Sequence, residues 1–293
     1  MARVSHRTCG YASARATPAT LRAMKVDLHT HTTASDGSFT PRQLLDTVRA
    51  EGVELWSITD HDTVDAYREL PRFDDIRIVP GIELSAVWLG RTIHVVGLDI
   101  DLNSPELEAM VNLQGQARER RAEMIAGRLQ RRGLQVDLDD VRRRAGSAGI
   151  GRPHFAASLV ESGQVRDVRT AFRKFLGAGR PGDLKQLWPP LAEIVTCIRS
   201  TGGTPVLAHP DKYKLTRSKL HCLAEDFGAA GGSAIELICG PHDLASRDKL
   251  RDLALTFDFS VSMGSDFHAP VPWNRPGVSA DLLRGCRPVW ETW

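Results

Sequence analysis

The stretch VDLHTHTTASDG, close to the N-terminus, places the strongest constraint on how this chain folds. Val26 and Leu28 alternate with polar residues, a pattern that predicts a short strand with one buried face. Side chains two residues apart point to the same side of a strand, so His29 and His31 are expected to lie together, with Asp36 in the loop beyond. Imidazoles and carboxylates are common ligands of divalent transition metals, although two ordinary polar residues at a strand end would give the same local pattern.

Short apolar segments alternate with helical patterns along the chain, and seven of these segments are expected to form strands. They are residues 26–31, 55–60, 76–83, 92–98, 205–209, 234–238 and 260–264. Each of the first four brings a potential metal ligand to, or near, its expected C-terminal end. Barrels of alternating strands and helices carry their active sites at that end, so the sequence predicts an α/β fold with its site there.

A long segment without any strand pattern interrupts this alternation. Helices are expected at residues 104–133, 138–145, 153–161 and 167–176. The first is expected to bury an apolar face that includes Leu107, Met124 and Leu129. Three parts of the chain are therefore predicted: a flexible tail at 1–23, a main domain formed by 24–102 and 181–293, and a helical insertion, or cap, at 103–180.

The charge of the chain is unevenly distributed between these parts. The whole chain has a formal net charge of +2, with 42% hydrophobic and 25% charged residues, which is ordinary for a globular protein. Residues 103–180 contain 15 Lys/Arg against 9 Asp/Glu, a net charge of +6, which leaves −4 for the remainder. A basic segment beside an acidic body suits a negatively charged substrate.

The cysteines and the N-terminus indicate a cytoplasmic protein. The five cysteines are odd in number and have no CxxC spacing, which argues for reduced thiols rather than a disulfide framework. The N-terminal residues contain no apolar core of the signal-peptide type, and no apolar run reaches the roughly 18 residues of a membrane span. No membrane association or obligate protein partner is expected.

Six histidines and three acids gather at or near the ends of the expected strands. They are His29, His31, His61, His94, His209 and His268, with Asp36, Glu83 and Asp266. This is too many nitrogen and oxygen ligands for one ion, so two or three divalent metals are predicted. Such sites hold both oxygens of a phosphoryl transfer and lower the pKa of a bound water. No serine or cysteine lies in a nucleophile-elbow motif, so water is the expected nucleophile.

The motifs HTHTTASDG, ITDHD, PGIEL, AHP and GSDFH resemble, in order, those of the polymerase-and-histidinol-phosphatase (PHP) phosphoesterase superfamily. The segments GRPHFAASLVESG, FRKFL, VLAHPDKY and GSDFHAPVPW resemble one branch of it. That branch contains the bacterial 3′,5′-nucleoside bisphosphate phosphatases and the 5′-to-3′ exoribonuclease RNase AM. The resemblance covers most of the chain beyond the N-terminal tail.

The resemblance implies a distorted (β/α)7 barrel with a three-metal site. The first metal would be held by His29, His31, Glu83 and Asp266, the second by Asp36, His61 and His268, and the third by Glu83 with His94 and His209. Among these ligands, Glu83, Asp266 and His209 are the expected catalytic residues. The resemblance favours manganese as the bound metal, and iron and zinc occur in relatives. Arg152 and His154 are expected to bind a phosphate of the substrate.

Other charged residues receive more ordinary interpretations. Asp60 and Asp62, on either side of His61, are interpreted as carboxylates that orient the ligand imidazoles. Glu236, on a late strand, is interpreted as structural. The arginines at 142–144 are interpreted as a solvated helix face.

The leading hypothesis is a metal-dependent phosphoesterase that acts on nucleoside 3′,5′-bisphosphates, on the 5′ ends of short RNAs, or on both. A histidinol-phosphatase-like enzyme is the alternative within the superfamily, and the helical insertion argues against it. Amidohydrolases also begin with His-x-His, but no expected strand end here offers the lysine that they typically carboxylate. A non-catalytic PHP module would tend to lose ligands, whereas this chain keeps the full set.

Overall fold

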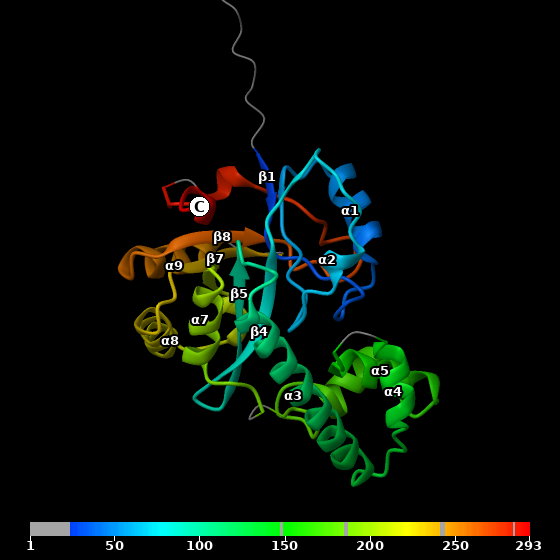
Figure 1. Ribbon diagram of the computed structural model, residues 1–293. Helices are drawn as coiled ribbons and strands as arrows, with labels where there is room; N and C mark the ends of the chain where they lie inside the picture. The colour runs from blue at the N-terminus through cyan, green and yellow to red at the C-terminus, as the bar shows by residue number, and fades with distance from the viewer. Residues whose placement is uncertain (1–23, 147–148, 185–186, 241–243, 284) are drawn as a thin grey trace, which may run out of the picture.

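The computed structural model describes residues 24–146, 149–184, 187–240, 244–283 and 285–293. The tail expected at 1–23 lies outside the described residues. The described chain is a mixed α/β fold with two sheets and a group of helices beside them (Figure 1). No helix among the described residues is both long and apolar enough to cross a bilayer.

The first sheet has the strand order β3-β2-β1-β9. Its strands are β1 (Lys25–Asp27), β2 (Leu55–Trp56), β3 (Arg77–Ile78) and β9 (Val278–Ser279), with β1, β2 and β3 parallel and β9 antiparallel to β1. The sheet is covered by α1 (Pro41–Ala50), which begins with a capping box between Thr40 and Gln43, and by the short α2 (Ala66–Glu69). The buried face of α1 includes Leu44 and Leu45, which pack in the same cluster as Trp56.

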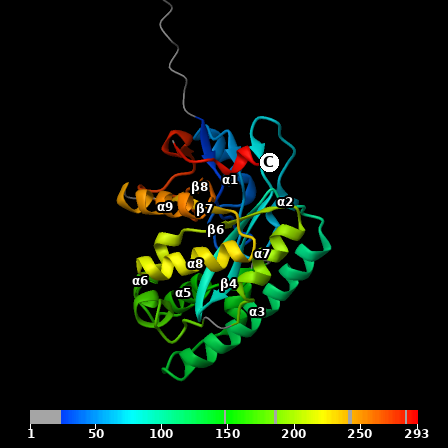
Figure 2. The same ribbon diagram turned by 90° about the vertical axis from the view of Figure 1, so that its left-hand side faces the viewer.

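The second sheet has the strand order β4-β5-β6-β7-β8. Its strands are β4 (Gly81–Trp88), β5 (Arg91–Leu98), β6 (Thr204–Leu207), β7 (Ala234–Cys239) and β8 (Ser260–Gly264). The pairs β4–β5 and β5–β6 are antiparallel, whereas β6, β7 and β8 are parallel. The helices α7 (Leu191–Ser200), α8 (Arg217–Ala229) and α9 (Leu244–Thr256) lie along one side of this sheet (Figure 2). Short 3₁₀ turns at Pro210–Tyr213, Ala280–Leu283 and Val289–Glu291 complete the described elements.

The chain that follows β1 and β2 links the first sheet to both edges of the second sheet, β8 and β4. On one side Leu28 donates its N–H to the Met263 carbonyl at 3.0 Å, and Thr30 forms an isolated bridge with Phe267. On the other side, His61 forms a bridge with Glu83. Among the described residues the strands therefore form two linked sheets, and no single continuous ladder closes them into one barrel.

The prediction of one strand at residues 76–83 is wrong, because this segment contains the separate strand β3 and the start of β4. Pro80 lies between them and has no N–H to donate, and β3 pairs with the first sheet while β4 pairs with the second. The expected placement of every ligand near a C-terminal strand end is also wrong for two residues. Glu83 is the third residue of β4, and His94 lies in the middle of β5, because these strands form an antiparallel hairpin.

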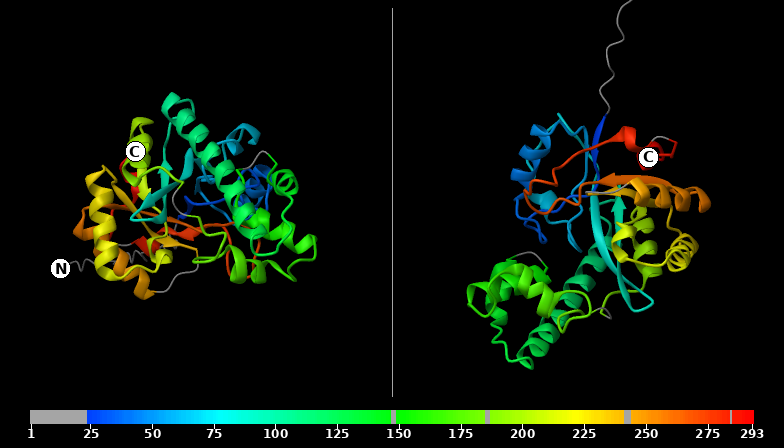
Figure 3. Two further views of the ribbon diagram at one scale, coloured as in Figure 1. Left: turned by 90° about the horizontal axis from the view of Figure 1, so that it is seen from below. Right: turned by 180° about the vertical axis from the view of Figure 1, so that it is seen from behind.

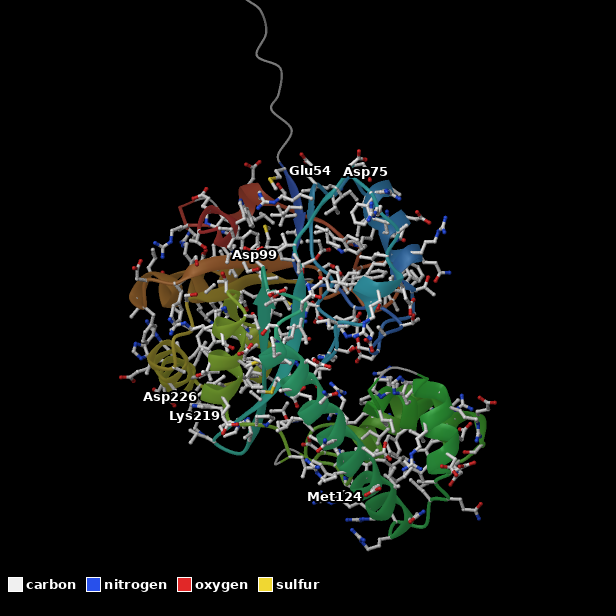
Figure 4. All side chains as sticks on the ribbon, viewed as in Figure 1. Glu54, Asp75, Asp99, Met124, Lys219 and Asp226 are labelled. Atoms are coloured by element: carbon white, nitrogen blue, oxygen red, sulfur yellow. The ribbon has the colours of Figure 1, made fainter. Side chains whose placement is uncertain are left out.

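The expected helices of the insertion are confirmed as α3 (Pro105–Gln130), α4 (Leu138–Ala145), α5 (Arg152–Glu161) and α6 (Val168–Ala171), followed by a π-helical turn at Phe172–Leu176. These helices share a hydrophobic cluster of their own, which includes Ile125, Phe155 and Leu159. Seen from behind, α3 is the long element that joins them to the second sheet (Figure 3). Met124 does not join the buried face as expected: it is 44% exposed, on the part of α3 farthest from the sheets (Figure 4).

Candidate metal centre

The segment that follows β1 brings His29 and His31 into the junction between the two sheets. Both side chains are fully buried, and their Nε2 atoms lie 3.1 Å apart. Their position depends on close contact with the end of β8. A Cβ atom added to Gly264 would lie 2.4 Å from the His29 Cβ, so only glycine permits this approach.

Glu83 lies at the middle of the cluster and is fully buried. Each of its carboxylate oxygens faces different imidazoles. Oε1 lies 3.0 Å from His94 Nδ1 and 2.9 Å from His209 Nε2, and Oε2 lies 3.2 Å from His29 Nε2, 3.3 Å from His31 Nε2 and 3.0 Å from His61 Nδ1. The bridge between His61 and Glu83 joins two of these residues through the backbone as well.

Two further acids complete the cluster. Asp266 Oδ1 lies 3.3 Å from His31 Nε2 and 3.5 Å from His29 Nε2. Asp36 Oδ1 lies 3.2 Å from His268 Nε2. The nine residues predicted as ligands thus come together, and each belongs to a group of three or four whose ligand atoms lie within 4.8 Å of one another.

Metal ions fit these donors better than hydrogen bonds do. Two imidazole nitrogens cannot satisfy each other at 3.1 Å when neither carries a proton, yet a cation between them satisfies both. Several buried atoms of the cluster also have no hydrogen-bond partner among the described residues: His31 Nδ1, Asp36 Oδ1, His61 Nδ1, Glu83 Oε2 and His209 Nδ1. The donors are imidazoles and carboxylates, which suit manganese, iron and zinc.

The electrostatics of the cluster favour the metal-binding forms of Glu83 and His31. For His29, burial is outweighed by the carboxylates of Glu236 and Glu83, which raise the pKa of its imidazole well above the usual value. Burial disfavours the charged form of Glu83, but the imidazoles of His61 and His29 hold the pKa of its carboxyl well below the usual value. Burial lowers the pKa of His31 to about 3, and the neighbouring His268 acts in the same direction. An ionised carboxylate and a neutral imidazole are the forms that bind metals.

A cavity of about 510 Å³ opens beside the cluster, between it and the insertion. Asp36, His61 and His94 of the cluster line it. Its basic lining residues are Arg118 and Arg121 from α3, Arg152 from the start of α5, Arg91 and Lys212, and Trp188 lines it as well. The guanidinium carbons of Arg118 and Arg121 lie 5.3 and 5.5 Å from the centre of the Trp188 ring.

The sequence-predicted phosphate ligands have different positions. Arg152 lines the cavity, where Nη1 donates to the Leu176 carbonyl at 3.1 Å and lies 3.6 Å from Asp183 Oδ1. His154 Nδ1 accepts the Gly151 N–H at 3.0 Å and so caps its own helix. His154 is not among the residues that line this cavity.

Two arginines of the cavity were missed by the sequence interpretation. Arg118 donates through Nε to Asp62 Oδ2 at 2.8 Å, and Nη2 of the same side chain also contacts that oxygen. Arg121 is 7% exposed, forms no ion pair within the described part of the chain, and donates through Nε to the Leu184 carbonyl at 3.2 Å. Burial, with the positive charges of Arg152 and Arg118, lowers the pKa of Arg121 to about 9. The sequence did contain a signal for this pair: Arg118 and Arg121 are three residues apart on α3, which places both on one face of the helix.

The carboxylates beside His61 do not orient imidazoles in this structure. Asp60 accepts hydrogen bonds from the Thr32 N–H and hydroxyl and from the Ser35 hydroxyl, so it holds the loop after His31. Asp62 accepts from Ser85 and pairs with Arg118. Both carboxylates fix backbone segments and leave the ligand rings to other partners.

Comparison with known proteins places the chain among phosphoesterases. It is 38% identical over 271 residues to the 3′,5′-nucleoside bisphosphate phosphatase of Chromobacterium violaceum. The match covers 91% of this chain and 95% of that protein. It is 36% identical over 276 residues to the 5′-3′ exoribonuclease Rnm of Escherichia coli, covering 92% and 94%. No family model matches the chain.

Solved structures agree with this placement. A protein from Chromobacterium violaceum described as an amidohydrolase, with sulfate bound and no metal, superimposes with a TM-score of 0.81 at 35% identity, covering 91% of this chain and 95% of that one. A protein from Bifidobacterium adolescentis assigned as a metal-dependent phosphoesterase gives a TM-score of 0.73 at 26% identity, covering 89% and 94%. The fold and the histidine–carboxylate cluster are those of a metal-dependent phosphoesterase. The chain belongs to the PHP family, in the branch of the bisphosphate phosphatases and 5′-3′ exoribonucleases.

Proposed function

We propose that this enzyme removes the 3′-phosphate from nucleoside 3′,5′-bisphosphates and releases nucleotides from the 5′ ends of short RNAs. One observation carries the proposal: the histidine–carboxylate cluster opens onto a cavity that is also lined by a basic wall, formed by Arg118, Arg121 and Arg152. Both reactions cleave a phosphoester at a 3′ oxygen while a 5′-phosphate is held nearby. A site that combines the histidine–carboxylate cluster with nearby arginines suits both reactions.

The cluster would hold two or three divalent ions, with manganese as the metal that the family resemblance favours. Bound metal ions supply Lewis acidity and an activated water for phosphoester hydrolysis. Following the family resemblance, His29, His31, Glu83 and Asp266 would bind one ion, Asp36, His61 and His268 a second, and Glu83, His94 and His209 a third. In the structure Glu83 groups with His29 and His209 and also with His61 and His94. Glu83 would be shared between ions, because its two oxygens face different histidines.

The basic wall would bind the phosphate that is not cleaved. Arg121 and Arg152 are positively charged groups whose burial disfavours their charge, and a phosphate anion between them would relieve that cost. The sequence also predicts a phosphate contact for His154. Its Nδ1 accepts the Gly151 N–H, which leaves Nε2 as the donor of the neutral ring, but the residue does not line this cavity. Binding energy from this remote phosphate would position the scissile bond over the cluster.

The finer description of the fold belongs to the same proposal. The two sheets, linked by the Thr30–Phe267 and His61–Glu83 bridges, would correspond to the distorted seven-stranded barrel of the family. Residues 103–180 would act as a cap that carries the basic wall, and residues 24–102 and 181–293 as the main domain.

A side-by-side assay tests the proposed substrates. Purified protein with manganese is given 3′-phosphoadenosine 5′-phosphate in one reaction and a 5′-phosphorylated RNA oligomer in another. We expect inorganic phosphate from the first and mononucleotides, released in order from the 5′ end, from the second. Hydrolysis of histidinol phosphate with neither of these substrates cleaved would refute the proposal in favour of the alternative within the superfamily.

A further inference from the structure

Glu236 lies in the middle of β7, beneath the metal centre, and is 1% exposed. β7 pairs with β6 on one side and with β8 on the other. The chain after β6 supplies His209, and the chain after β8 supplies Asp266. Glu236 is therefore placed between two segments that carry ligands, although it faces neither the cavity nor solvent.

One oxygen of Glu236 contacts the ring of His29. Oε1 lies 2.6 Å from His29 Nδ1, in a fully buried pair. An ionised carboxylate can only accept, so the proton between the two atoms belongs to Nδ1. The lone pair of Nε2 is then directed at the cluster, where Glu83 Oε2 lies 3.2 Å away and His31 Nε2 lies 3.1 Å away.

The other oxygen of Glu236 contacts the backbone of His209. Oε2 accepts the His209 N–H at 2.6 Å. His209 has φ 31° and ψ 55°, in the left-handed region that residues other than glycine rarely adopt. This backbone conformation turns the His209 ring back toward Glu83, whose Oε1 lies 2.9 Å from Nε2.

Glu236 itself is better described as a hydrogen-bond acceptor than as a metal ligand. Both of its oxygens already have a donor at 2.6 Å. Cys239, which lies close enough to His29 and Glu236 to form a possible ligand group, has the Lys212 ammonium 3.5 Å from its sulfur. The same ammonium contacts Asp266 Oδ2, so the description of Glu236 as an acceptor rests on its own two occupied oxygens.

We propose that Glu236 is a positioning residue for the metal centre, one carboxylate that fixes the ring of His29 and the backbone of His209 at the same time. The inference rests on the proposed metal centre and extends it to a residue outside the ligand set. Carboxylates that hold a ligand imidazole typically account for about 10- to 100-fold in metal affinity. Because Glu236 supports two ligands assigned to different ions, its loss should weaken the binding of more than one ion.

The test measures Mn²⁺ binding to chelator-treated full-length protein, together with the thermal unfolding of the same protein without metal. Glu236→Gln keeps the shape of the side chain but leaves only one acceptor oxygen for the two donors. We expect its Mn²⁺ dissociation constants to rise about 10- to 100-fold, with excess Mn²⁺ restoring both the bound ions and the hydrolytic activity. If Glu236→Gln does not fold, Glu236→Asp answers the same question, because the shorter side chain cannot reach both partners.

Ile235→Val is the matched control. Ile235 is the preceding residue of β7, is fully buried, and contacts the hydrophobic core rather than the ligands. This change should lower the unfolding temperature slightly and leave Mn²⁺ affinity at the wild-type value. Wild-type Mn²⁺ affinity in a folded Glu236 variant would overturn the inference. Failure of the wild-type protein to bind Mn²⁺ would instead refute the proposed metal centre.

Discussion

Glu83 is the residue on which the proposed metal centre would depend most, because its carboxylate contacts five imidazoles. No other acid of the cluster has contacts with so many histidines in the described structure. Removing its carboxylate would leave two groups of histidines without the charge that joins them.

We predict that Glu83→Ala lowers kcat by at least about 100-fold, more than the loss of any single histidine ligand. The reason is that Lewis acidity and the activated water each contribute several kcal/mol to phosphoester hydrolysis. Glu225→Ala, an exposed glutamate on α8, is the control and should keep full activity. Near-normal turnover by correctly folded Glu83→Ala would show that the shared-ligand assignment is wrong.

We predict that Arg152→Ala impairs hydrolysis of a 3′,5′-bisphosphate about 10- to 150-fold in kcat/KM, with little effect on a simple aryl phosphate. An aryl phosphate has no second phosphate for the basic wall to bind. Arg143→Ala is the control, because Arg143 is 67% exposed and already pairs with Asp140 at 3.3 Å. Equal losses on both substrates would mean that Arg152 supports the fold rather than the substrate.

At the residue scale, the sequence indicated nine side chains that the structure brings together, but it did not indicate the residues that support them. Ligand motifs are short and local, so spacing such as His-x-His carries the information. The roles of Arg121 and Glu236 depend on which elements pack together, and nothing local to either residue reports that. Glu236 was interpreted as structural for this reason.

At the scale of elements, the two sheets show what a local pattern cannot decide. Residues 76–83 are a largely apolar segment that resembles one strand, yet the chain on either side of Pro80 belongs to different sheets. The β4–β5 hairpin was also missed, because its turn uses Leu89 and Gly90, both with positive φ, rather than the usual Asn-Gly. The helices of the insertion were predicted because their caps and periodicity are local signals.

The ion pair between Arg118 on α3 and Asp62 after β2 joins the insertion to the metal centre. It is largely buried, so Arg118→Met should leave an unpaired carboxylate and lower the free energy of unfolding by about 3–5 kcal/mol. Arg142→Met breaks the Arg142–Glu119 pair, which is 41% and 42% exposed, and should cost about 1 kcal/mol or less. Denaturant unfolding of metal-free protein measures both, and equal losses would refute a structural role for the Arg118 pair.

At the scale of the whole molecule, the segregation of charge agrees with the two kinds of group that line the cavity. Residues 103–180 have a net charge of +6 and supply the arginines of the basic wall, whereas the remainder is acidic overall and supplies the nine predicted ligands. The surface arginines of α4 contribute little to this wall, because Arg142, Arg143 and Arg144 each pair with nearby carboxylates.

Protein purified without chelator should contain more than one transition-metal ion per chain by elemental analysis, because the donor atoms form several groups around shared Glu83 and His31. Removing these ions should lower the unfolding temperature, since a ligand that binds only the folded state stabilises it. At most one ion per chain, even after reconstitution with manganese, would contradict a polynuclear centre.

The most direct test of the account follows the products of 3′-phosphoadenosine 5′-phosphate during hydrolysis by the metal-loaded enzyme. The account predicts that 5′-AMP and inorganic phosphate appear in equal amounts, that both disappear when the metals are removed, and that manganese restores them. Release of the 5′-phosphate instead, or unchanged turnover by protein freed of all metal, would contradict it.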